Sequence, residues 1–412
     1  MRVGHAAVEL PVPEGTPLGG YAARTGPSTG TGDRLEVSAV TLDGLTWVVA
    51  DLPYVHEDVV AAVAARVPGP VWVSATHTHS GPETSCQPAS PTTPAPWLSS
   101  VASAAAAAST AAAAAAGEAG LEVRRVRLSG VGGQRSGARP RRTVPVDILS
   151  FVDGAGSLAG LLVVLPVHPT VLGADNLLVS ADLSGAARRA LAGRLGGPWV
   201  VVATGAAGDV STRPHRRAQT PEECARLGGL VADTVLRGLA GPPRAVAPPG
   251  TPVLTDETRV PLEPKPPPGS PELIVRLEDR LARARRGGSA VAERTAYTAL
   301  QAAQLAAVAP APPPDPACAV AVAGIGPVRL VALGAEPYLA LAERLDGRLD
   351  AATVLVGYTN GYLGYLPTRA AYRRSDYEVL RSPVAAGSAE DVLDRAARMA
   401  AGPVTHHRKD RP

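Results

Sequence analysis

Two histidines separated by one residue, His77 and His79, end the apolar segment VWVSATHTHSGPE at residues 71–83. The chain has only eight histidines in 412 residues, so their close spacing needs an explanation. If the strand continues through them, side chains at positions i and i+2 point to the same face and the imidazoles lie side by side. Imidazole binds zinc and exchanges protons near neutral pH, so the pair indicates a metal or proton-transfer site. A hydrogen-bonded surface pair is the alternative.

Three further apolar runs end in polar side chains close to Gly or Pro. His168 ends VVLPVHPT, Glu336 ends VALGAEP, and Tyr358, Tyr362 and Tyr365 follow in VGYTNGYLGYLPT. Ligand sites of α/β proteins gather at the carboxyl ends of strands, and two histidines with one carboxylate are a common catalytic zinc set. Taken singly, VHPT is also typical of a core histidine, and a Glu before Pro is also typical of a helix start.

The elements around these runs indicate an α/β fold with a mixed β-sheet core flanked by helices and the zinc site at strand ends. The sequence predicts two strands around the Asp43–Gly44 turn, a helix at 56–67 and an Ala-rich helix at 99–120. The segments 158–170 and 198–211 are continuous apolar runs, as expected for strands buried on both faces. Strands that alternate with helices are typical of α/β proteins.

An Arg- and Ala-rich helical segment lies between Pro-rich stretches. GPPRAVAPPG and PKPPPGSP precede it, and APAPPPDPA follows it. We therefore expect a helical, Pro-flanked insertion at about 264–316 within a single domain spanning 1–412.

Composition narrows the range of partners. The 40 basic and 37 acidic side chains nearly balance, and aromatic residues make up 3% with a single Phe, so we expect no nucleic-acid partner. Three widely spaced cysteines indicate free thiols in a reducing compartment. The N-terminus lacks an apolar leader segment, and the Ala-rich helix is too weakly apolar for a membrane span. These features predict a cytoplasmic protein without stable membrane insertion.

Five motifs together resemble the neutral/alkaline non-lysosomal ceramidase family. ATHTHSGP, VHPT, GAAGDVS, GAEP and NGYLGYLPTRAAYRRSDYE occur in the family's order between residues 75 and 378. The N-terminal VGHAAVELPVPEGTPLGGYAAR is similar to the start of that catalytic domain, so the resemblance covers most of the chain. It implies a zinc-dependent catalytic domain, and we expect no C-terminal immunoglobulin-like domain.

The resemblance assigns a role to each matching residue. The implied zinc ligands are His77, His168, Glu336 and Tyr365. His79 matches a histidine that transfers protons beside the metal. Tyr377 matches a catalytic tyrosine near the substrate carbonyl, Arg135 matches an arginine of the site, and Ser211 matches a serine at the floor of the pocket.

These roles describe a zinc-dependent amidohydrolase that cleaves a small-molecule N-acyl amide. Zinc lowers the pKa of bound water to about 7, a phenol such as Tyr377 stabilises the oxyanion, and His79 protonates the leaving amine. The low aromatic content favours a substrate other than ceramide. The alternatives are a true ceramidase acting on N-acylsphingosine, an amide-forming acyltransferase that uses the reverse chemistry, and a non-catalytic zinc-binding relative.

Overall fold

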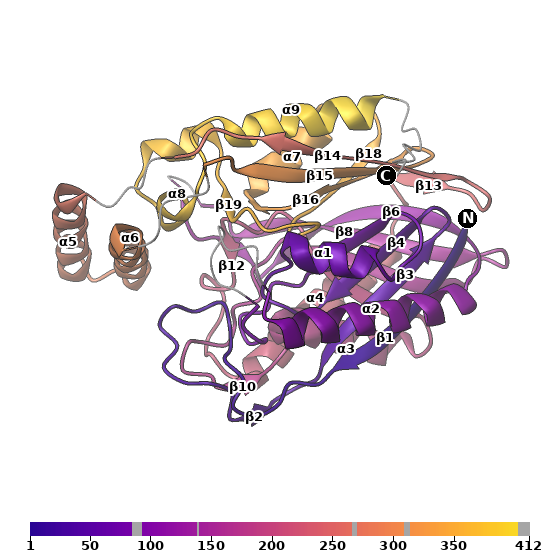
Figure 1. Cartoon of the computed structure of the whole chain (residues 1–412), viewed down its shortest axis with the longest axis horizontal. Coiled ribbons are helices and arrows are strands. Elements are labelled where there is room, and N and C mark those ends of the chain that lie inside the picture. The colour runs from indigo at the N-terminus through magenta and orange to yellow at the C-terminus, as the bar shows by residue number, and fades with distance from the viewer. Residues whose placement is uncertain (85–92, 138–139, 266–269, 309–313, 403–412) are drawn as a thin grey trace.

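A computed structural model describes residues 1–84, 93–137, 140–265, 270–308 and 314–402. The described residues form a large mixed sheet and a smaller one, with helices on the outer face of each (Figure 1). This arrangement confirms the predicted α/β fold with a mixed sheet core flanked by helices. Among the described residues, no helix is long and apolar enough to span a membrane.

The large sheet contains nine strands within the described residues. Eight of them are hydrogen-bonded in the order β11 (Trp199–Thr204), β9 (Leu158–Leu165), β8 (Thr143–Asp153), β6 (Gly117–Ser129), β1 (Arg2–Leu10), β3 (Leu35–Leu42), β4 (Leu45–Ala50) and β5 (Val71–Ala75). The ninth, β13 (Ala245–Ala247), pairs with β6. The strands β3 and β4 form the predicted hairpin around Asp43–Gly44.

The small sheet has the order β14 (Val253–Pro261), β15 (Ala317–Ile325), β16 (Val328–Leu333) and β18 (Ala352–Val356). Its inner face packs on the large sheet, because one hydrophobic cluster contains Trp47 and Val49 of β4 together with Leu330 of β16. The intervening β4 residues, Val48 and Ala50, point to the opposite face and contact helices. This period of two buries the strand on both faces, as the continuous apolar runs predict.

Helices cover the outer faces of both sheets (Figure 1). α1 (Glu57–Ala64) and α2 (Ala95–Ala114) cover one half of the large sheet, and α3 (Asp182–Leu195) and α4 (Pro221–Leu239) cover the other half. α7 (Leu339–Asp346) and α9 (Ser388–Ala401) cover the small sheet. The Ala-rich helix begins earlier than predicted. It also ends earlier, because residues 117–120 belong to β6.

The large sheet curls so that its two edge strands approach each other. Thr204, at the end of β11, donates a hydrogen bond of 2.8 Å to the carbonyl of Thr76, just after β5. The loop after β18 completes the closure: the Gly357 amide donates to Thr204, and the Ala75 amide donates to the carbonyl of Tyr358. The ends of β5, β11 and β18 therefore meet at one place, where the polar side chains predicted from the sequence emerge.

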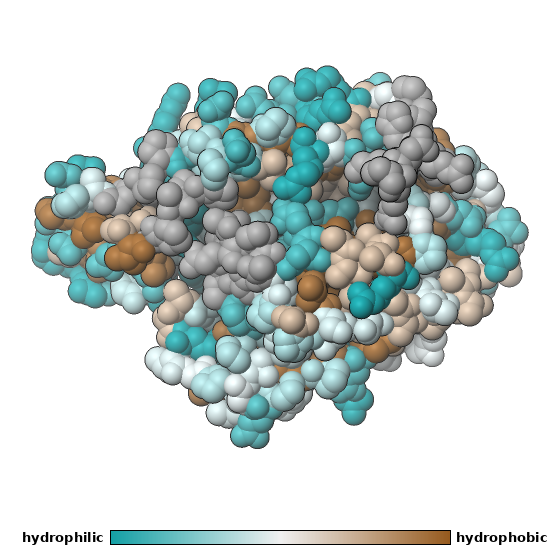
Figure 2. Space-filling view, viewed as in Figure 1, coloured by the Kyte–Doolittle hydropathy of each residue, from teal (hydrophilic) through white to brown (hydrophobic). Residues whose placement is uncertain are grey.

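Within the range predicted as a helical insertion, α5 (Pro271–Arg286) and α6 (Ala290–Val308) form a hairpin, which projects at the left of Figure 1. Its inner residues pack on α8 (Tyr377–Arg381), including Leu380 and Tyr377. Val291 and Val308 of α6 are exposed, and Figure 2 shows hydrophobic side chains on the surface of this projection.

Two of the three cysteines, Cys224 and Cys318, are buried and free, whereas Cys86 lies outside the described residues.

Candidate active site

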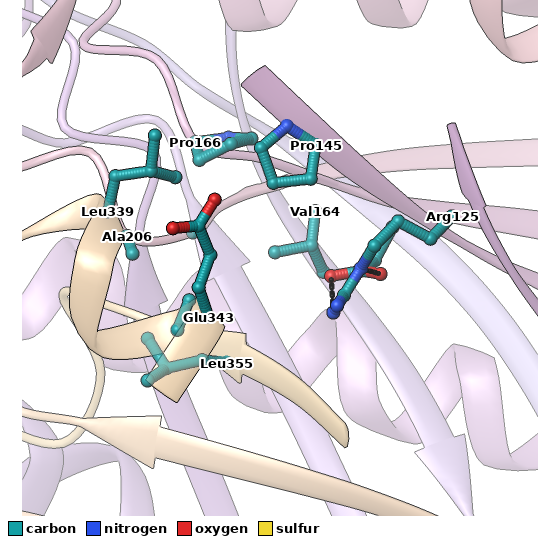
Figure 3. A pocket seen from close by; sticks show the side chains of 11 residues that line it. Arg125, Pro145, Val164, Pro166, Ala206, Leu339, Glu343 and Leu355 are labelled. Carbon is teal, nitrogen blue, oxygen red and sulfur yellow. Dashed lines mark hydrogen bonds and ion pairs between the residues drawn. The ribbon is translucent and has the colours of Figure 1, made fainter. Parts of the chain in front are cut away.

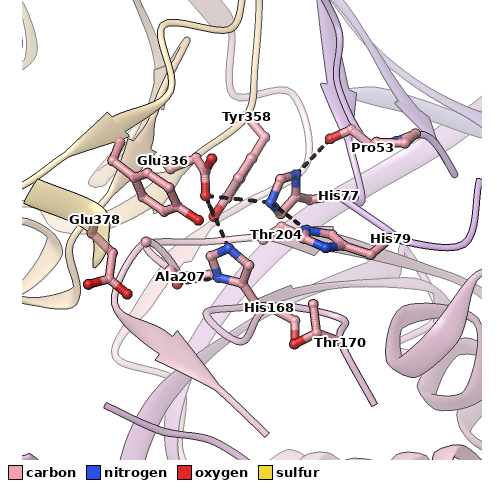
Figure 4. Close-up of polar contacts among 12 residues, drawn as sticks. Pro53, His77, His79, His168, Thr170, Thr204, Ala207, Glu336, Tyr358 and Glu378 are labelled. Carbon is pink, nitrogen blue, oxygen red and sulfur yellow. Dashed lines mark hydrogen bonds and ion pairs between the residues drawn. The ribbon is translucent and has the colours of Figure 1, made fainter. Parts of the chain in front are cut away.

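Two histidines and a carboxylate converge where the strand ends meet (Figure 4). His77 follows β5, His168 follows β9, and Glu336 begins β17 (Glu336–Pro337) just after β16. Oε2 of Glu336 lies 3.0 Å from Nε2 of His168 and 3.5 Å from Nε2 of His77. All three side chains are buried. The structure therefore brings together three of the four predicted ligands, from both sheets.

The backbone orients both imidazole rings toward Glu336. Nδ1 of His77 is 2.6 Å from the carbonyl oxygen of Pro53, and Nδ1 of His168 is 2.6 Å from that of Ala207. A carbonyl only accepts, so each Nδ1 carries the proton and each Nε2 presents a lone pair. Zinc-binding histidines characteristically donate their second N–H in this way.

The charge states of the clustered side chains favour the binding of a cation. Burial, and next the nearby Arg135, lower the pKa of His168 to about 3, so this ring is neutral at physiological pH. Burial alone raises the pKa of Glu336, but His77 and His168 outweigh it and hold that pKa well below its usual range. The neutral His168 ring and the ionised Glu336 carboxylate therefore meet beside the ring of His77. This donor set fits a zinc ion.

The expectation that His77 and His79 share the face of a strand is wrong. β5 ends at Ala75, and His77 adopts a left-handed backbone conformation with φ of 64°. The two imidazoles nevertheless lie close, with 3.2 Å between their Nε2 atoms. A turn, and not the two-residue period of a strand, produces this proximity.

His79 differs from the other two histidines in how it is held. The ring nitrogens of His77, His79 and His168 lie within 4.8 Å of one another, so all three could contact one metal ion. However, Nδ1 of His79 is buried and has no hydrogen-bond partner among the described residues. Burial, and next His77, hold the pKa of His79 well below its usual value, so it is neutral. An imidazole with a free nitrogen suits proton transfer better than ligation.

The N-terminal loop packs directly on His79. Gly20 has φ of +90°, and a Cβ at this position would lie 2.5 Å from Cγ of His79. The ring of Tyr21 contacts the His79 ring edge to face at 4.8 Å, and the Arg24 guanidinium donates to the His79 carbonyl. The segment PLGGYAAR thus positions His79 through a close backbone approach that only glycine permits.

Tyr365 and Arg135 lie next to this cluster. β19 (Tyr365–Leu366) pairs in parallel with β17, which places Tyr365 beside Glu336, and its ring stacks on that of His168 at 6.3 Å. Nη2 of Arg135 donates to the Tyr365 hydroxyl at 3.1 Å, and Nε donates to Glu378 at 2.7 Å. Burial raises the pKa of Tyr365 well above its usual value, and Arg135 opposes this shift.

The remaining predicted residues, Tyr377 and Ser211, border the same cluster. The ring of Tyr377 meets that of Tyr365 edge to face at 5.9 Å, and burial raises its pKa, so the phenol keeps its proton. Ser211 lies in β12 (Val210–Ser211), which pairs with β7 (Gly133–Gln134) and forms a bridge to His168. Its hydroxyl is buried without a partner among the described residues. All eight predicted residues are thus adjacent, while their roles stay predictions.

The sequence analysis named Tyr358 and Tyr362 without predicting that they hold Glu336, and it missed Glu378, which holds Arg135. The Tyr362 hydroxyl donates to Oε1 of Glu336 at 2.6 Å, and that of Tyr358 donates to Oε2 at 3.4 Å. Glu378 pairs with Arg135. The sequence pattern indicated Tyr358 and Tyr362 as candidate site residues, since both follow a strand end. Nothing in the sequence indicated Glu378 beyond its position next to Tyr377.

Backbone strain concentrates around the cluster. The four non-glycine residues with positive φ in the described part of the chain are His77, Asp182, Tyr358 and Asn360. His77 and Tyr358 belong to the site, Asn360 accepts from the Val73 amide of β5, and Asp182 accepts from the backbone just after VHPT. Each such residue costs on the order of 1 kcal/mol or more and persists only where the surroundings enforce it, as at functional sites.

A separate cavity of about 20 Å³ lies beside β9 and α7 (Figure 3). Arg125 borders it and binds Asp147 at 2.6 Å, while also donating to Asp346 at the end of α7. This volume accommodates about one water molecule. The cavity is therefore a packing defect beside an ion-pair network that joins the two sheets, and it cannot hold the substrate.

Gly208 is expected to be essential for the geometry of Glu336. A Cβ at this position would lie 2.4 Å from the Glu336 carbonyl oxygen, so Gly208→Ala must displace β17. We expect a loss of about 1–3 kcal/mol in the free energy of unfolding, together with a lower zinc content. Denaturant titration and metal analysis measure both effects. In contrast, Gly193→Ala in α3 has open space around its Cβ and should be neutral or stabilising. Wild-type stability and zinc content in Gly208→Ala would contradict this role.

The fold of the described residues is shared with solved neutral ceramidases. The structure matches neutral ceramidase from Pseudomonas aeruginosa with a TM-score of 0.73 and 17% identity, covering 97% of this chain and 74% of that one. It also matches a ceramidase complexed with C2, with a TM-score of 0.74, 18% identity and the same coverages. No family model and no curated protein matches the sequence. The resemblance seen in the motifs is therefore confirmed by a shared fold.

Proposed function

We propose that this protein is a zinc-dependent amidohydrolase that cleaves the amide bond of an N-acyl compound. The observation that carries the proposal is the convergence of two Nε2 lone pairs and a carboxylate oxygen, within 3.5 Å, beside a histidine with a free buried nitrogen. His77, His168, Glu336 and Tyr365 would hold the ion. The ion supplies Lewis-acid activation of water at neutral pH. The ceramidase fold supports the same reaction class.

The remaining residues have complementary tasks in this reaction. His79 is neutral and has a free Nδ1, so it can accept a proton from water and deliver it to the departing amine. Tyr377 keeps its proton and can donate a hydrogen bond to the carbonyl oxygen as that oxygen becomes negative. Arg135 fixes the Tyr365 hydroxyl, and Glu378 fixes Arg135. Ser211 offers an unpartnered hydroxyl for orienting the substrate.

The test is an assay of the zinc-loaded protein on a panel of N-acyl amines, with the metal content measured in parallel. The proposal predicts about one zinc per chain and release of free acid and amine. A second arm supplies free acid and amine together, because net amide formation would favour the acyltransferase alternative. Stoichiometric zinc without turnover in either direction would identify a non-catalytic relative.

The length of the acyl chain distinguishes a general amidohydrolase from a true ceramidase, which the solved ceramidase structures make the strongest alternative. The single Phe, Phe151, is buried against Trp199, so it does not line the site. We therefore expect kcat/KM to be flat or to fall beyond short chains. Each buried methylene contributes about 0.8 kcal/mol, so a deep acyl tunnel would instead give a steep rise. The assay uses one amine, acyl chains of increasing length and constant detergent. A steep rise up to long-chain ceramide would restore the ceramidase assignment.

A further inference from the structure

Three arginines that form no ion pair with a described residue act on Tyr21, whose ring contacts His79. Within the described ranges, no ion pair involves Arg24, Arg213 or Arg216. Arg24 donates to the backbone carbonyls of Asn176 and His79, and Arg216 donates to the carbonyl of Thr170 at 2.5 Å. Arg213 is half-buried, and neither a hydrogen bond nor an ion pair joins it to a described residue. Among the described residues, no carboxylate therefore forms an ion pair with Arg213 or Arg216, although Glu378 and Asp182 act on them through space.

Tyr21 connects these arginines to the reacting groups. Its ring contacts His79 at 4.8 Å, and Arg24, Arg213 and Arg216 all act on it electrostatically. Arg213 lies two residues after Ser211. Because the backbone of Ser211 forms a β-bridge with that of His168, Arg213 is close to the site. Arg213 and Arg135 repel each other, which agrees with this placement.

Two carboxylates of this region, Glu378 and Asp182, accept hydrogen bonds from other groups. Glu378 accepts from Arg135 at 2.7 Å. The Asp182 carboxylate accepts backbone amide hydrogens from Val171 and Leu172 at 3.0 and 2.9 Å. Neither carboxylate is in an ion pair with the arginines around Tyr21, so an anion from outside the protein would complete this arrangement.

We propose that the substrate carries a carboxylate on its amine half, so that it is an N-acyl amino acid, and that Arg213 recognises this carboxylate. The inference rests on the proposed amidohydrolase function. A guanidinium pairs with a carboxylate through two parallel hydrogen bonds, and the free donors of Arg213 allow this geometry. Arg24 and Arg216 use part of their donors on the backbone and add charge around the same position.

The position of His79 assigns the carboxylate to the amine half. In hydrolysis the oxygen of water bonds to the acyl carbon, the C–N bond breaks, and the nitrogen gains a proton. His79 delivers that proton, so the amine half lies on the side of His79, where Tyr21 and the arginines are. In an N-acyl amino acid the carboxylate is one carbon from the nitrogen, which keeps it within reach of this side. Ceramide has hydroxyl groups in this half and no anion.

The electrostatics of Arg213 agree with an anionic ligand. Burial, and next Arg135 and Arg294, lower its pKa to about 10, so the guanidinium is charged but destabilised at neutral pH. A carboxylate beside it would reverse this destabilisation. Binding should therefore weaken as ionic strength rises, more for a charged substrate than for a neutral one.

A matched pair of substrates tests the proposal. N-octanoylglycine and N-octanoylethanolamine share the acyl chain. The first carries a carboxylate where the second carries a hydroxymethyl group. We expect the wild-type protein to prefer N-octanoylglycine by about 10- to 100-fold in kcat/KM. Arg213→Gln should remove most of that preference through KM, with little change on N-octanoylethanolamine, and Arg213→Lys should retain part of it. Arg217→Gln makes the same charge change at an exposed position of the same loop and should behave like wild type.

A binding measurement separates this inference from the proposed function. Calorimetry on Tyr377→Phe, with and without Arg213→Gln, compares the Kd values of the two amides while turnover is slowed about 10²- to 10³-fold. Tighter binding of N-octanoylglycine that Arg213→Gln abolishes supports carboxylate recognition even if hydrolysis is absent. Equal Kd values for the two amides, or an equal effect of Arg213→Gln on both, overturn the inference and leave the amidohydrolase proposal intact. No hydrolysis of any amide by the zinc-loaded wild type overturns the proposed function instead.

Discussion

Replacing His168 by alanine is expected to remove the bound zinc and to lower amide hydrolysis by about 10³-fold or more. His168 is buried, neutral and 3.0 Å from Glu336, and its Nδ1 is fixed by the Ala207 carbonyl. Its Nε2 faces Glu336, in the position that the proposed ligand role requires. His77 has the same arrangement, with Pro53 in place of Ala207, so His77→Ala should have the same effect. Metal analysis after dialysis, followed by an activity assay with added zinc, measures both consequences.

His215→Ala is the matched control for this prediction. His215 lies on the turn after Ser211, where its ring contacts the carbonyl of Arg142, outside the cluster. This variant should keep about one zinc per chain and full activity. Circular dichroism should show that each variant is folded. Full zinc retention in folded His77→Ala and His168→Ala would refute the ligand assignment.

Replacing His79 by alanine, or Tyr377 by phenylalanine, is expected to leave zinc bound while kcat falls by about 10²- to 10³-fold. The free Nδ1 of His79 and the protonated phenol of Tyr377 indicate proton transfer and oxyanion stabilisation, which act in the transition state and not on the metal. The loss should therefore appear in kcat more than in KM.

The result for His79 also decides between two arrangements of ligands. The three imidazoles lie close enough to bind one ion together, and in that case His79→Ala would lose zinc like His77→Ala. Tyr372→Phe serves as the control for the tyrosine, because Tyr372 bonds to Val384 and Ser382, away from the cluster. A His79→Ala variant with zinc bound and near-normal kcat would exclude both roles for this residue.

Much of the fold could be predicted from local sequence because local patterns determine it. The Asp43–Gly44 hairpin depends on a turn of two residues, and the continuous apolar runs reflect burial on both faces of each strand. The site was found in outline for a similar reason. Each of its predicted ligands ends or follows an apolar run, and ends of strands are where an α/β sheet leaves room for polar groups.

The precise geometry could not be predicted from local sequence. Whether His77 continues a strand or enters a left-handed turn depends on the Leu52 carbonyl, which accepts its backbone amide. The approach of β5 and β11 depends on the contact between Thr204 and Thr76 and on the loop after β18. Residues this far apart leave no periodic signal. Glu378 supports Arg135 across a similar separation, and for that reason its contribution was missed.

The closure of the large sheet by the loop after β18 has a consequence for the order of folding. β5 lies at the end of the strand order, and on its side away from β4 the backbone groups of Val73 and Ala75 bond to Tyr358 and Asn360. During synthesis, this edge stays open until about nine-tenths of the chain has emerged, and an open edge can pair with another nascent chain. Glu336 and Tyr365 are also synthesised late. We therefore expect the chain to reach its native topology first and to acquire zinc afterwards, so that metal supply controls activity without controlling assembly.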